Sequence, residues 1–421
     1  MGTDILCTAD VHLGRSPGSI AGRPVGADLS VAAAWQRLID KAVEMTVDVV
    51  ALAGDIADRD NALFEAFSLL QSGVSQLVDA GIEVVAVAGN HDSTVLPRLV
   101  AELPQVHFIG AGGRWEDCII QRDGRPVLRV RGWSFPGPSV SDSPLATCPD
   151  DRTDLPTLGL LHCDPETPSH YAPVKMTEFA GKGVDAWVIG HLHRPLQRQA
   201  DSPLVVQCGS LCPLDPSETG PHGPWLITLG DHQPRVKQLS LAPLRWEPRQ
   251  IDTSDLHDSE QLEEALMADL RATHRELSAE GSDVTVACRL ELTGRTPLFR
   301  QIKDITAAAD KLEFAEGDVR CVVDGVVNNT AAAVDLDERA RSDDPAGLLA
   351  RRLIVLERRE PAEEYHRLIA EGRRQVADVR SKPAFGLLSD GQDDEEELRM
   401  QLLRAGNDLM EDLLAKREGG E

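Results

Sequence analysis

The stretch VVALAGDIAD, residues 49–58, joins an apolar run to an acidic turn. Residues 47–53 are apolar, rich in valine and too few for a helix, so they predict a buried β-strand that Gly54 ends. Asp55 and Asp58 follow at once, which places two carboxylates at the carboxyl end of this strand. The same order, a buried strand and then polar side chains, recurs through residues 1–240 and decides the expected fold.

Four more polar motifs stand where predicted strands end. Ligand-binding groups at the carboxyl ends of neighbouring strands meet at one edge of an α/β fold. The i, i+2 spacing within two of the motifs predicts that, on extended backbone, both polar side chains of each pair face the same side. The four motifs are Asp10-Val11-His12, Gly89-Asn90-His91-Asp92, His162 and Gly190-His191-Leu192-His193.

The residue types in these motifs select the kind of bound ion. Aspartate, histidine and asparagine without a cysteine thiolate suit Mn²⁺, Fe²⁺ or Zn²⁺ with positions open to water, rather than a closed structural zinc site. A carboxylate can bridge two ions that lie about 3.5–4 Å apart. The glycines before Asp55, Asn90 and His191 are expected to turn the chain sharply into the site. Five such motifs in this order predict a dinuclear metal site that hydrolyses phosphoesters.

Short apolar runs alternate with helical stretches in the first half of the chain, which predicts sheets covered by helices. Helical spacing extends over 29–45 and 62–80, and Asp123-Gly124 predicts the turn of a hairpin. The texture changes after Pro243. The elements expected there are a helix over 255–278 capped by Ser254, a strand over 284–292, a helix over 299–314 and a strand over 319–323.

The bulk composition restricts the function. A formal charge of −26 disfavours tight duplex binding by the protein alone, so bound divalent ions or a partner would have to supply positive charge. Aromatic residues make up 4%, which disfavours reading single strands with stacked rings. The eight cysteines form no CxxC pair and are expected to be buried thiols. The N-terminus resembles no signal peptide and no long apolar run occurs, which predicts a soluble, cytoplasmic protein without a membrane partner.

The series DxH, GDxxD, GNHD, H and GHxH resembles the calcineurin-like metallophosphoesterase superfamily. Within it, the segments ADVHLGR (9–15), GNHDS (89–93) and GHLHRP (190–195) resemble the SbcD-type DNA-repair nucleases. LTGRTPL (292–298) resembles part of their capping domain. Gly209-Ser210 and ETGPHG (218–223) are closer to the YhaO-like branch. The resemblance covers residues 1–330 and fades beyond them.

The fold class expected from pattern and resemblance is α/β. It comprises a two-sheet metallophosphoesterase sandwich flanked by helices, a smaller α+β capping domain and a helical C-terminal tail. The last helix carries Leu398, Leu402, Leu409 and Leu413 on one stripe, so it either packs on its own domain or binds a partner. The expected boundaries are 1–243 for the nuclease domain, 244–335 for the capping domain, 336–380 for a helical segment, 381–397 for an acidic linker and 398–418 for the amphipathic helix.

The resemblance also implies a role for each residue of the site. Two ions are expected, one held by Asp10, His12 and His193, the other by Asn90, His162 and His191, with Asp55 bridging both. His91 would meet the scissile phosphate and aid the leaving oxygen, oriented by Asp92. Asp58 would lie behind the ligands and steady the turn. Arg15, Arg194 and His222 are weaker candidates for contact with the substrate.

The predicted function is a DNA exonuclease and/or endonuclease for DNA repair, which hydrolyses phosphodiester bonds by two-metal, in-line attack of water. The ions are expected to be Mn²⁺, with Fe²⁺, Mg²⁺ or Zn²⁺ as alternatives. By resemblance the partners are DNA, an SMC-like coiled-coil ATPase of the SbcC type, and a second copy of the chain. Two other functions stay open: a small-molecule phosphodiesterase or phosphatase of the same superfamily, and a non-catalytic scaffold subunit. GDIADRD and GNHDS disfavour the protein phosphatases, which carry GDxVDRG and GNHE, and the complete ligand set disfavours the scaffold.

Overall fold

The computed structural model describes residues 2–20, 22–58, 63–166, 169–200, 203–230, 233–281, 283–299, 301–307, 309–380 and 394–418. No described helix has the length and apolar character that a membrane span requires. The chain forms two compact units. The first comprises Met1–Glu247, Arg271–Cys288 and Glu313–Asp324, and the second comprises Pro248–Leu270, Arg289–Leu312 and Gly325–Glu421. The domain boundaries predicted from the sequence remain predictions.

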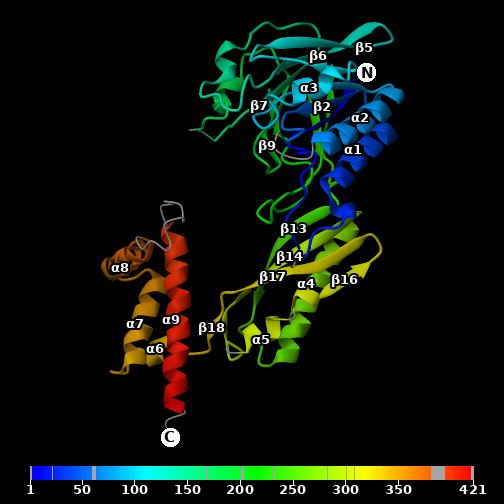
Figure 1. Ribbon diagram of the computed structural model, residues 1–421. Helices are drawn as coiled ribbons and strands as arrows, with labels where there is room; N and C mark the ends of the chain where they lie inside the picture. Colours follow the sequence, from blue (N-terminus) through cyan, green and yellow to red (C-terminus); the bar gives the residue numbers. More distant parts are fainter. Residues whose placement is uncertain are drawn as a thin grey trace. The chain divides into compact units, whose positions relative to one another are not determined.

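Two six-stranded sheets form the first unit (Figure 1). The first sheet has the order β12-β11-β1-β2-β3-β4, in which β1 to β4 are parallel and β11 and β12 are antiparallel. Its strands are β1 (Thr3–Thr8), β2 (Val49–Ala53), β3 (Glu83–Val87), β4 (Val106–Phe108), β11 (Trp225–Leu229) and β12 (Arg235–Gln238).

The second sheet has the order β5-β6-β7-β8-β10-β9. Four of its strands are parallel, and the outer strands β5 and β9 are antiparallel to their neighbours. Its strands are β5 (Glu116–Arg122), β6 (Arg125–Trp133), β7 (Thr157–His162), β8 (Ala186–Gly190), β9 (Leu196–Gln199) and β10 (Leu204–Gln207).

The alternation of side chains along each strand builds the layers of this unit. In β1, Ile5 and Cys7 enter the core between the two sheets, whereas Leu6 faces the helices. Three helices cover that outer face of the first sheet: α1 (Val31–Met45), α2 (Leu63–Asp79) and α3 (Leu96–Ala101), with the short η1 (Ala27–Leu29) before α1. A separate apolar cluster, together with η2 (Pro144–Thr147) and η3 (Met176–Phe179), lies on the outer side of the second sheet. The predicted two-sheet sandwich flanked by helices is confirmed.

The strand expected over 47–53 occurs as β2, which begins two residues later and ends at the same residue. The Asp123-Gly124 hairpin between β5 and β6 is also present, and both of its turn residues have positive φ. The sequence did not reveal β11, which returns beside β1 and makes β1 an inner strand. The eight cysteines are free thiols, and of these only Cys118 is not buried, as expected for a chain without disulfides.

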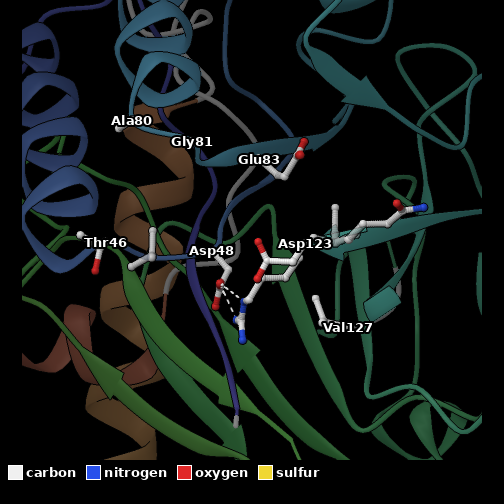
Figure 2. Close-up of a pocket in the computed structure, with 11 residues that line it drawn as sticks. Thr46, Asp48, Ala80, Gly81, Glu83, Asp123 and Val127 are labelled. Carbon is white, nitrogen blue, oxygen red and sulfur yellow. Dashed lines mark hydrogen bonds and ion pairs between the residues drawn. The ribbon is translucent and has the colours of Figure 1, made fainter. Parts of the chain in front are cut away.

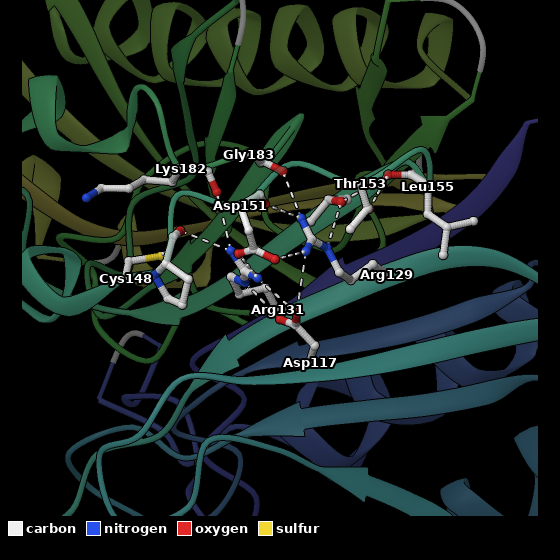
Figure 3. A network of polar contacts seen from close by, with 11 residues as sticks. Asp117, Arg129, Arg131, Cys148, Asp151, Thr153, Leu155, Lys182 and Gly183 are labelled. Carbon is white, nitrogen blue, oxygen red and sulfur yellow. Dashed lines mark hydrogen bonds and ion pairs between the residues drawn. The ribbon is translucent and has the colours of Figure 1, made fainter.

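Two arginines of β6 tie the second sheet to the loops beside it (Figure 3). Arg129 and Arg131 are each 2% exposed. The Asp117 carboxylate accepts from Arg131 Nε at 2.8 Å and from its Nη2 at 2.9 Å. Asp151 accepts from both arginines, and the carbonyl of Gly183 accepts from Arg129 Nη2 at 3.1 Å. Because the guanidinium groups meet carboxylates and carbonyls, this group of residues, the arginine clamp, is a closed polar network.

A second polar region lies at the amino ends of β2 and β3. There an open pocket of about 310 Å³ is lined by Thr46, Asp48, Glu83, Arg122 and neighbouring residues (Figure 2). Arg122 Nε donates to Asp48 Oδ1 over 2.9 Å. Both side chains are partly exposed, so this is an ion pair within reach of solvent. None of the five polar motifs lies at this end of the sheet.

The chain after β12 contains two small sheets, a four-stranded one with order β13-β14-β17-β16 and a β15–β18 pair. Its strands are β13 (Leu244–Asp252), β14 (Val284–Thr293), β15 (Arg295–Thr296), β16 (Glu313–Glu316), β17 (Val319–Asn328) and β18 (Ala331–Ala332). Its helices are α4 (Ser259–Ala279), α5 (Ile302–Thr306), η4 (Ala309–Lys311), α6 (Leu336–Arg339), α7 (Pro345–Arg358), α8 (Ala362–Arg380) and α9 (Glu395–Glu418).

Two expectations for this region are wrong. Ser254 does not cap α4: its amide and hydroxyl bond Asp252, and Asp258 instead accepts from the amide of Gln261 at the helix start. The helix expected over 299–314 is only the short α5, followed by η4 and then strand β16.

The C-terminal helix folds back onto its own unit. Leu398, Leu403 and Met410 of α9 are buried in a cluster with residues of α7 and α8. Of the predicted leucine stripe, Leu409 alone is largely exposed, at 49%. Most of this face therefore packs on its own unit, and binding of a partner by this helix remains a prediction. Residues 381–393 of the expected acidic linker lie outside the described residues, and 395–397 are already helical.

Candidate metal centre

The polar motifs come together at one end of the sandwich. Asp10 and His12 follow β1, Asp55 follows β2 and Asn90 follows β3, while His162 ends β7 and His191 and His193 follow β8. The first sheet therefore contributes three segments and the second sheet two, at the carboxyl ends of parallel strands in both.

The first group of donors is Asp10, His12 and His193, whose ligand atoms all lie within 4.8 Å of one another. His12 Nε2 and His193 Nε2 are 3.2 Å apart, with their rings tilted at 57°. Asp10 is fully buried and its two oxygens accept from the backbone N–H of His191 at 3.0 and 3.2 Å. Its carboxylate is thereby fixed beside the two imidazoles.

The second group adjoins the first because it shares Asp10, together with Asp55 and His162. Asp55 Oδ2 lies 3.2 Å from His162 Nε2. Asn90 Oδ1 lies 3.1 Å from the same nitrogen and 3.2 Å from His191 Nδ1. All seven residues predicted as ligands thus belong to two neighbouring groups of donor atoms.

The chemistry of these donors fits divalent cations. Carboxylate oxygens, an amide oxygen and imidazole nitrogens point at common centres, and no lysine or arginine pairs with them among the described residues. Nε2 of His12 and Nε2 of His193 lie 3.2 Å apart, so both imidazoles direct a ring nitrogen toward the same centre. A buried cluster of this kind is stabilised when metal ions bind it.

The protonation states differ among the donors of the metal-free site. Although burial opposes it, Asp55 raises the pKa of His162 to about 9, and burial raises the pKa of Asp10, so His162 must lose a proton when an ion binds. Burial lowers the pKa of His12 to about 3 and that of His191 to about 4, so both imidazoles are neutral at pH 7. Burial opposes ionisation of Asp55, but the adjacent His162 holds the pKa of this carboxyl below its usual range. Neutral imidazoles and ionised carboxylates are the forms that bind metal ions.

The backbone at the site is unusual. Asp10, His12, Asp55 and His191 have φ values of 48°, 51°, 53° and 108°, in the left-handed region that side chains other than glycine rarely adopt. The two i, i+2 pairs therefore do not lie on extended backbone as expected. Their side chains converge because the chain turns after the strand, a conformation typical of functional sites.

The glycines of the motifs act in two ways. Gly54 has a φ of 88°, so it makes the expected sharp turn before Asp55. Gly89 has no such φ, and its role is close approach: a Cβ at this position would lie 2.2 Å from Asp55 Oδ1. The expectation of a turn is wrong for Gly89.

The expected pairing of Asp92 with His91 is also not observed. Asp92 is fully buried, and its carboxylate accepts from the amides of Ile56 at 2.7 Å and Gly89 at 2.8 Å. It joins the two turns that carry Asp55 and Asn90. Asp58 approaches His91 instead, with Oδ1 3.7 Å from His91 Nδ1. Asp92, which adjoins His91 in the sequence, is therefore turned inward, and the carboxylate of Asp58 from the neighbouring loop lies beside His91 instead.

Asp58 lies at the centre of a small polar group at the rim. Its Oδ2 is 3.8 Å from His12 Nδ1 and 3.6 Å from Arg15 Nε. The His91 side chain is 43% exposed, and its ring meets the His12 ring edge-on at 5.3 Å between centroids. His91 and Arg15 are therefore held beside the donors yet remain open to solvent.

The two other weaker candidates for substrate contact, Arg194 and His222, differ in their exposure to solvent. Arg194 is exposed, as a phosphate contact requires. His222 is 1% exposed, and its Nδ1 bonds with Ser210 at 3.0 Å. His222 therefore cannot contact a substrate from its place in the structure, and that expectation is wrong.

Three residues of the site were not singled out from the sequence. Glu218 Oε1 accepts from His193 Nδ1 at 2.8 Å. Asp164 Oδ2 lies 3.9 Å from His191 Nε2, and the Tyr171 ring lies over His191 at 5.1 Å between centroids while 42% exposed. The signal for Glu218 was the ETGPHG segment itself, whereas loop residues such as Tyr171 carry no local pattern that marks them.

Comparison with known proteins agrees with this geometry. Residues 3–195 match the family model described as calcineurin-like phosphoesterase, and residues 246–331 match the middle domain of metallophosphoesterase YhaO. The chain therefore contains a calcineurin-like metallophosphoesterase domain, a fold that binds divalent metal ions. Its second matched segment supports the YhaO-like branch.

The relatives show how far this similarity extends. The uncharacterized metallophosphoesterase YhaO of Bacillus subtilis is 27% identical over 272 residues, 64% of this chain and 65% of that protein. The chain thus spans less than two thirds of that relative's length. The DNA double-strand break repair protein Mre11 of Haloferax volcanii is 27% identical over 379 residues, 81% of this chain and 78% of that protein. Among solved structures, the calcineurin-like phosphoesterase YfkN of B. subtilis is 14% identical and covers 57% of this chain and 91% of its own, with a TM-score of 0.37.

Proposed function

We propose that this protein is a metal-dependent DNA nuclease that hydrolyses phosphodiester bonds at the centre described above. The observation that carries the proposal is the convergence of Asp10, His12, Asp55, His162 and His193 beside a solvent-accessible His91. The similarity to an Mre11 protein, named for the repair of DNA double-strand breaks, over 81% of the chain supports DNA as the substrate.

Each donor group would hold one ion. Asp10, His12 and His193 would hold the first ion, and Asn90, His162 and His191 would hold the second, with Asp55 between them. Mn²⁺ is proposed for both, because imidazole, carboxylate and amide ligands without thiolate suit it. Two such ions supply an activated water nucleophile and stabilise charge on the phosphoryl oxygens.

The protein's own groups would bind and orient the scissile phosphate. His91 is exposed beside the donors, so its imidazole can donate a hydrogen bond to a phosphate oxygen or a proton to the leaving 3′-oxygen. Asp58, 3.7 Å from His91 Nδ1, would hold the ring in the orientation that presents Nε2. Arg15, fixed by Asp58, and Tyr171, over His191, lie where they could contact the DNA backbone.

The partners follow from the same reasoning. The net charge of −26 leaves the protein poorly suited to hold duplex DNA alone. An SMC-like coiled-coil ATPase that binds DNA would supply this affinity. A second copy of the chain is also proposed, on the family resemblance alone.

The test is Mn²⁺-dependent digestion of end-labelled linear duplex DNA, with bis-p-nitrophenyl phosphate as a small diester. His91→Asn should lower both activities by about 100-fold or more, because it removes the acid–base group and keeps the donors. His107→Asn, an exposed histidine of β4, is the matched control and should retain full activity.

The outcomes separate the alternatives. Cleavage of both substrates that His91→Asn abolishes supports the nuclease. Cleavage of the small diester alone, still absent when a DNA-binding partner is added, would favour the small-molecule phosphodiesterase. No cleavage of either substrate with Mn²⁺, Fe²⁺, Mg²⁺ or Zn²⁺ would favour the non-catalytic scaffold.

A further inference from the structure

A carboxylate lies directly behind one of the metal-facing histidines. Glu218, in the ETGPHG segment, accepts from His193 Nδ1 at 2.8 Å. The opposite ring nitrogen, Nε2, is the one that faces His12 Nε2 at 3.2 Å. Glu218 follows the last residue of the calcineurin-like match, residue 195, so that match assigns it no role.

The position of Glu218 is fixed on its far side. Its Oε2 accepts from the Ser210 hydroxyl at 2.7 Å and from the amide of Leu214 at 3.1 Å. Ser210 is fully buried, and its amide donates to the carbonyl of His193 at 2.8 Å. The Glu218 side chain is 12% exposed, so the carboxylate is held between His193 and Ser210 with little freedom to move.

The segment is also anchored beyond Glu218. The amide of Gly220 donates to the carbonyl of Trp246 at 3.0 Å, and Thr219 forms an isolated bridge with Trp246. His222, four residues after Glu218, also contacts Ser210. Backbone and side-chain contacts therefore hold the segment on both sides of Glu218.

This arrangement selects a tautomer. A neutral imidazole has one N–H and one lone pair, on different nitrogens. Because an ionised carboxylate can only accept, Glu218 places the proton of His193 on Nδ1 and leaves the lone pair on Nε2, toward the metal position.

Among the described residues, no carboxylate lies within hydrogen-bond distance of the outer ring nitrogen of the other imidazoles of the centre. His12 Nδ1 has no hydrogen-bond partner there. The carbonyl of Ala53 lies 3.0 Å from His162 Nδ1, and Asp164 stands 3.9 Å from His191 Nε2, beyond hydrogen-bond distance. Close carboxylate support therefore belongs to one of the two groups of donors, the one formed by Asp10, His12 and His193.

We propose that Glu218 is a positioning residue that fixes the metal-binding tautomer and orientation of His193, and so sets the divalent-ion affinity of the Asp10–His12–His193 position without affecting the other position. The inference rests on the proposed metal centre but not on the substrate. Outer partners of metal-binding histidines typically contribute about 10–100-fold to metal affinity.

The experiment is calorimetric titration of the full-length, chelator-treated protein with Mn²⁺. Wild type should bind two ions. Glu218→Ala should weaken one of the two binding steps by about 10–100-fold and leave the other unchanged. Glu218→Gln keeps an acceptor for Nδ1–H without the charge, so its affinity should lie between those of wild type and Glu218→Ala. Glu102→Ala, an exposed glutamate of the same unit, should bind as wild type does.

Two further measurements distinguish a positioning role of Glu218 from a general effect on protein stability. Thermal unfolding of the metal-free variants should match the wild type closely, and the kcat of Glu218→Ala on bis-p-nitrophenyl phosphate should recover at high Mn²⁺. An equal weakening of both steps together with a lower Tm would make Glu218 merely structural, and two unchanged steps would overturn its role. If the wild type binds no Mn²⁺ at all, the proposed metal centre itself is contradicted, and the role of Glu218 with it. DNA cleavage plays no part in the result.

Discussion

The sandwich contains two buried polar clusters that differ in how their charges are balanced. In the arginine clamp, Arg129 and Arg131 face Asp117, Asp151 and backbone carbonyls, so each donor meets an acceptor. At the metal centre, groups that can each donate a lone pair to a cation converge, as in the 3.2 Å approach of His12 Nε2 to His193 Nε2. Both clusters involve the second sheet, because the two arginines lie on β6 and His162 ends β7.

The balance of donors and acceptors distinguishes a structural polar network from a metal-binding site. A buried polar network whose partners are complementary is complete and contributes to the fold, since removing one partner leaves the others without compensation. A cluster of converging lone pairs is incomplete until cations arrive, and it contributes to function. Substitutions in the two clusters should therefore affect different properties.

The largest effect is expected from Asp55→Asn, which retains the shape of the side chain and removes the charge between the two donor groups. Activity on bis-p-nitrophenyl phosphate should fall by about 10⁴-fold, because several kcal/mol of transition-state stabilisation depend on the ions. The metal-free variant should lose only the stability that the pairing of Asp55 with His162 contributes, so its midpoint in urea should shift less than that of a variant in the arginine clamp. A marked loss of metal-free stability would break the comparison.

A large effect of the opposite kind is expected from Arg131→Met. This substitution removes the Arg131 donors of Asp117 and of the carbonyl of Pro149, while Asp117 keeps a 3.5 Å contact with Arg129, and it should lower the free energy of unfolding by about 3 kcal/mol. Activity per folded molecule should not change. The matched control is Arg152→Met, an arginine whose side chain is 75% exposed and pairs with Asp185, where less than about 1 kcal/mol is expected. Equal losses in the two variants would remove the distinction between buried and exposed pairs.

An intermediate effect is expected from the metal itself. Mn²⁺ at about 100 times its Kd should raise the free energy of unfolding by about 2.7 kcal/mol for each bound ion, through preferential binding to the folded state. Removal with a chelator should reverse the gain and abolish hydrolysis. The same addition should stabilise Arg131→Met as much as wild type and Asp55→Asn much less, as thermal unfolding with and without Mn²⁺ would reveal.

The smallest effect is expected at an exposed pair near the pocket of Figure 2, between His107 and Glu83 at 2.9 Å. The hydrogen bond with Cys118, against the opposing effect of partial burial and with help from Glu83, raises the pKa of His107 to about 9. Protonated His107 therefore stabilises the fold fully below about pH 6.5, and this contribution disappears as the pH rises through about 9.

The size of that contribution should stay under about 1 kcal/mol, since both side chains are 43% exposed. Comparing the urea unfolding of wild type and His107→Gln near pH 6 and near pH 10 would measure it. A difference that grows with pH would contradict the assigned direction.

The sequence predicted the central strands well, because short valine-rich runs ended by glycine or polar residues leave few alternatives. It predicted which polar residues gather, since the order of the motifs follows the order of parallel strands. It could not predict β11, whose place beside β1 depends on pairing between residues more than 200 positions apart, such as Ile5 and Ile227. The region 299–314 was misjudged because helical spacing over a few turns is weaker than the pairing that makes 313–316 a strand.

Details within the site were beyond local reasoning. Asp92 adjoins His91 in the sequence, yet its carboxylate is needed by the amides of Ile56 and Gly89, and Asp58 from another loop approaches His91. Glu218 reaches His193 from 25 positions along the chain. Which carboxylate serves which imidazole is decided by loop geometry, and spacing in the sequence does not encode it.

The left-handed residues of the site have a consequence for how it could evolve. Asp10, His12, Asp55 and His191 hold φ values that β-branched side chains tolerate poorly, whereas glycine and asparagine accept them readily. Substitutions that destroy ion binding can therefore relieve strain at the same positions, and lineages that lose the activity could gain stability in doing so. Because these donor side chains strain the backbone, they serve the chemistry of the site rather than the stability of the fold.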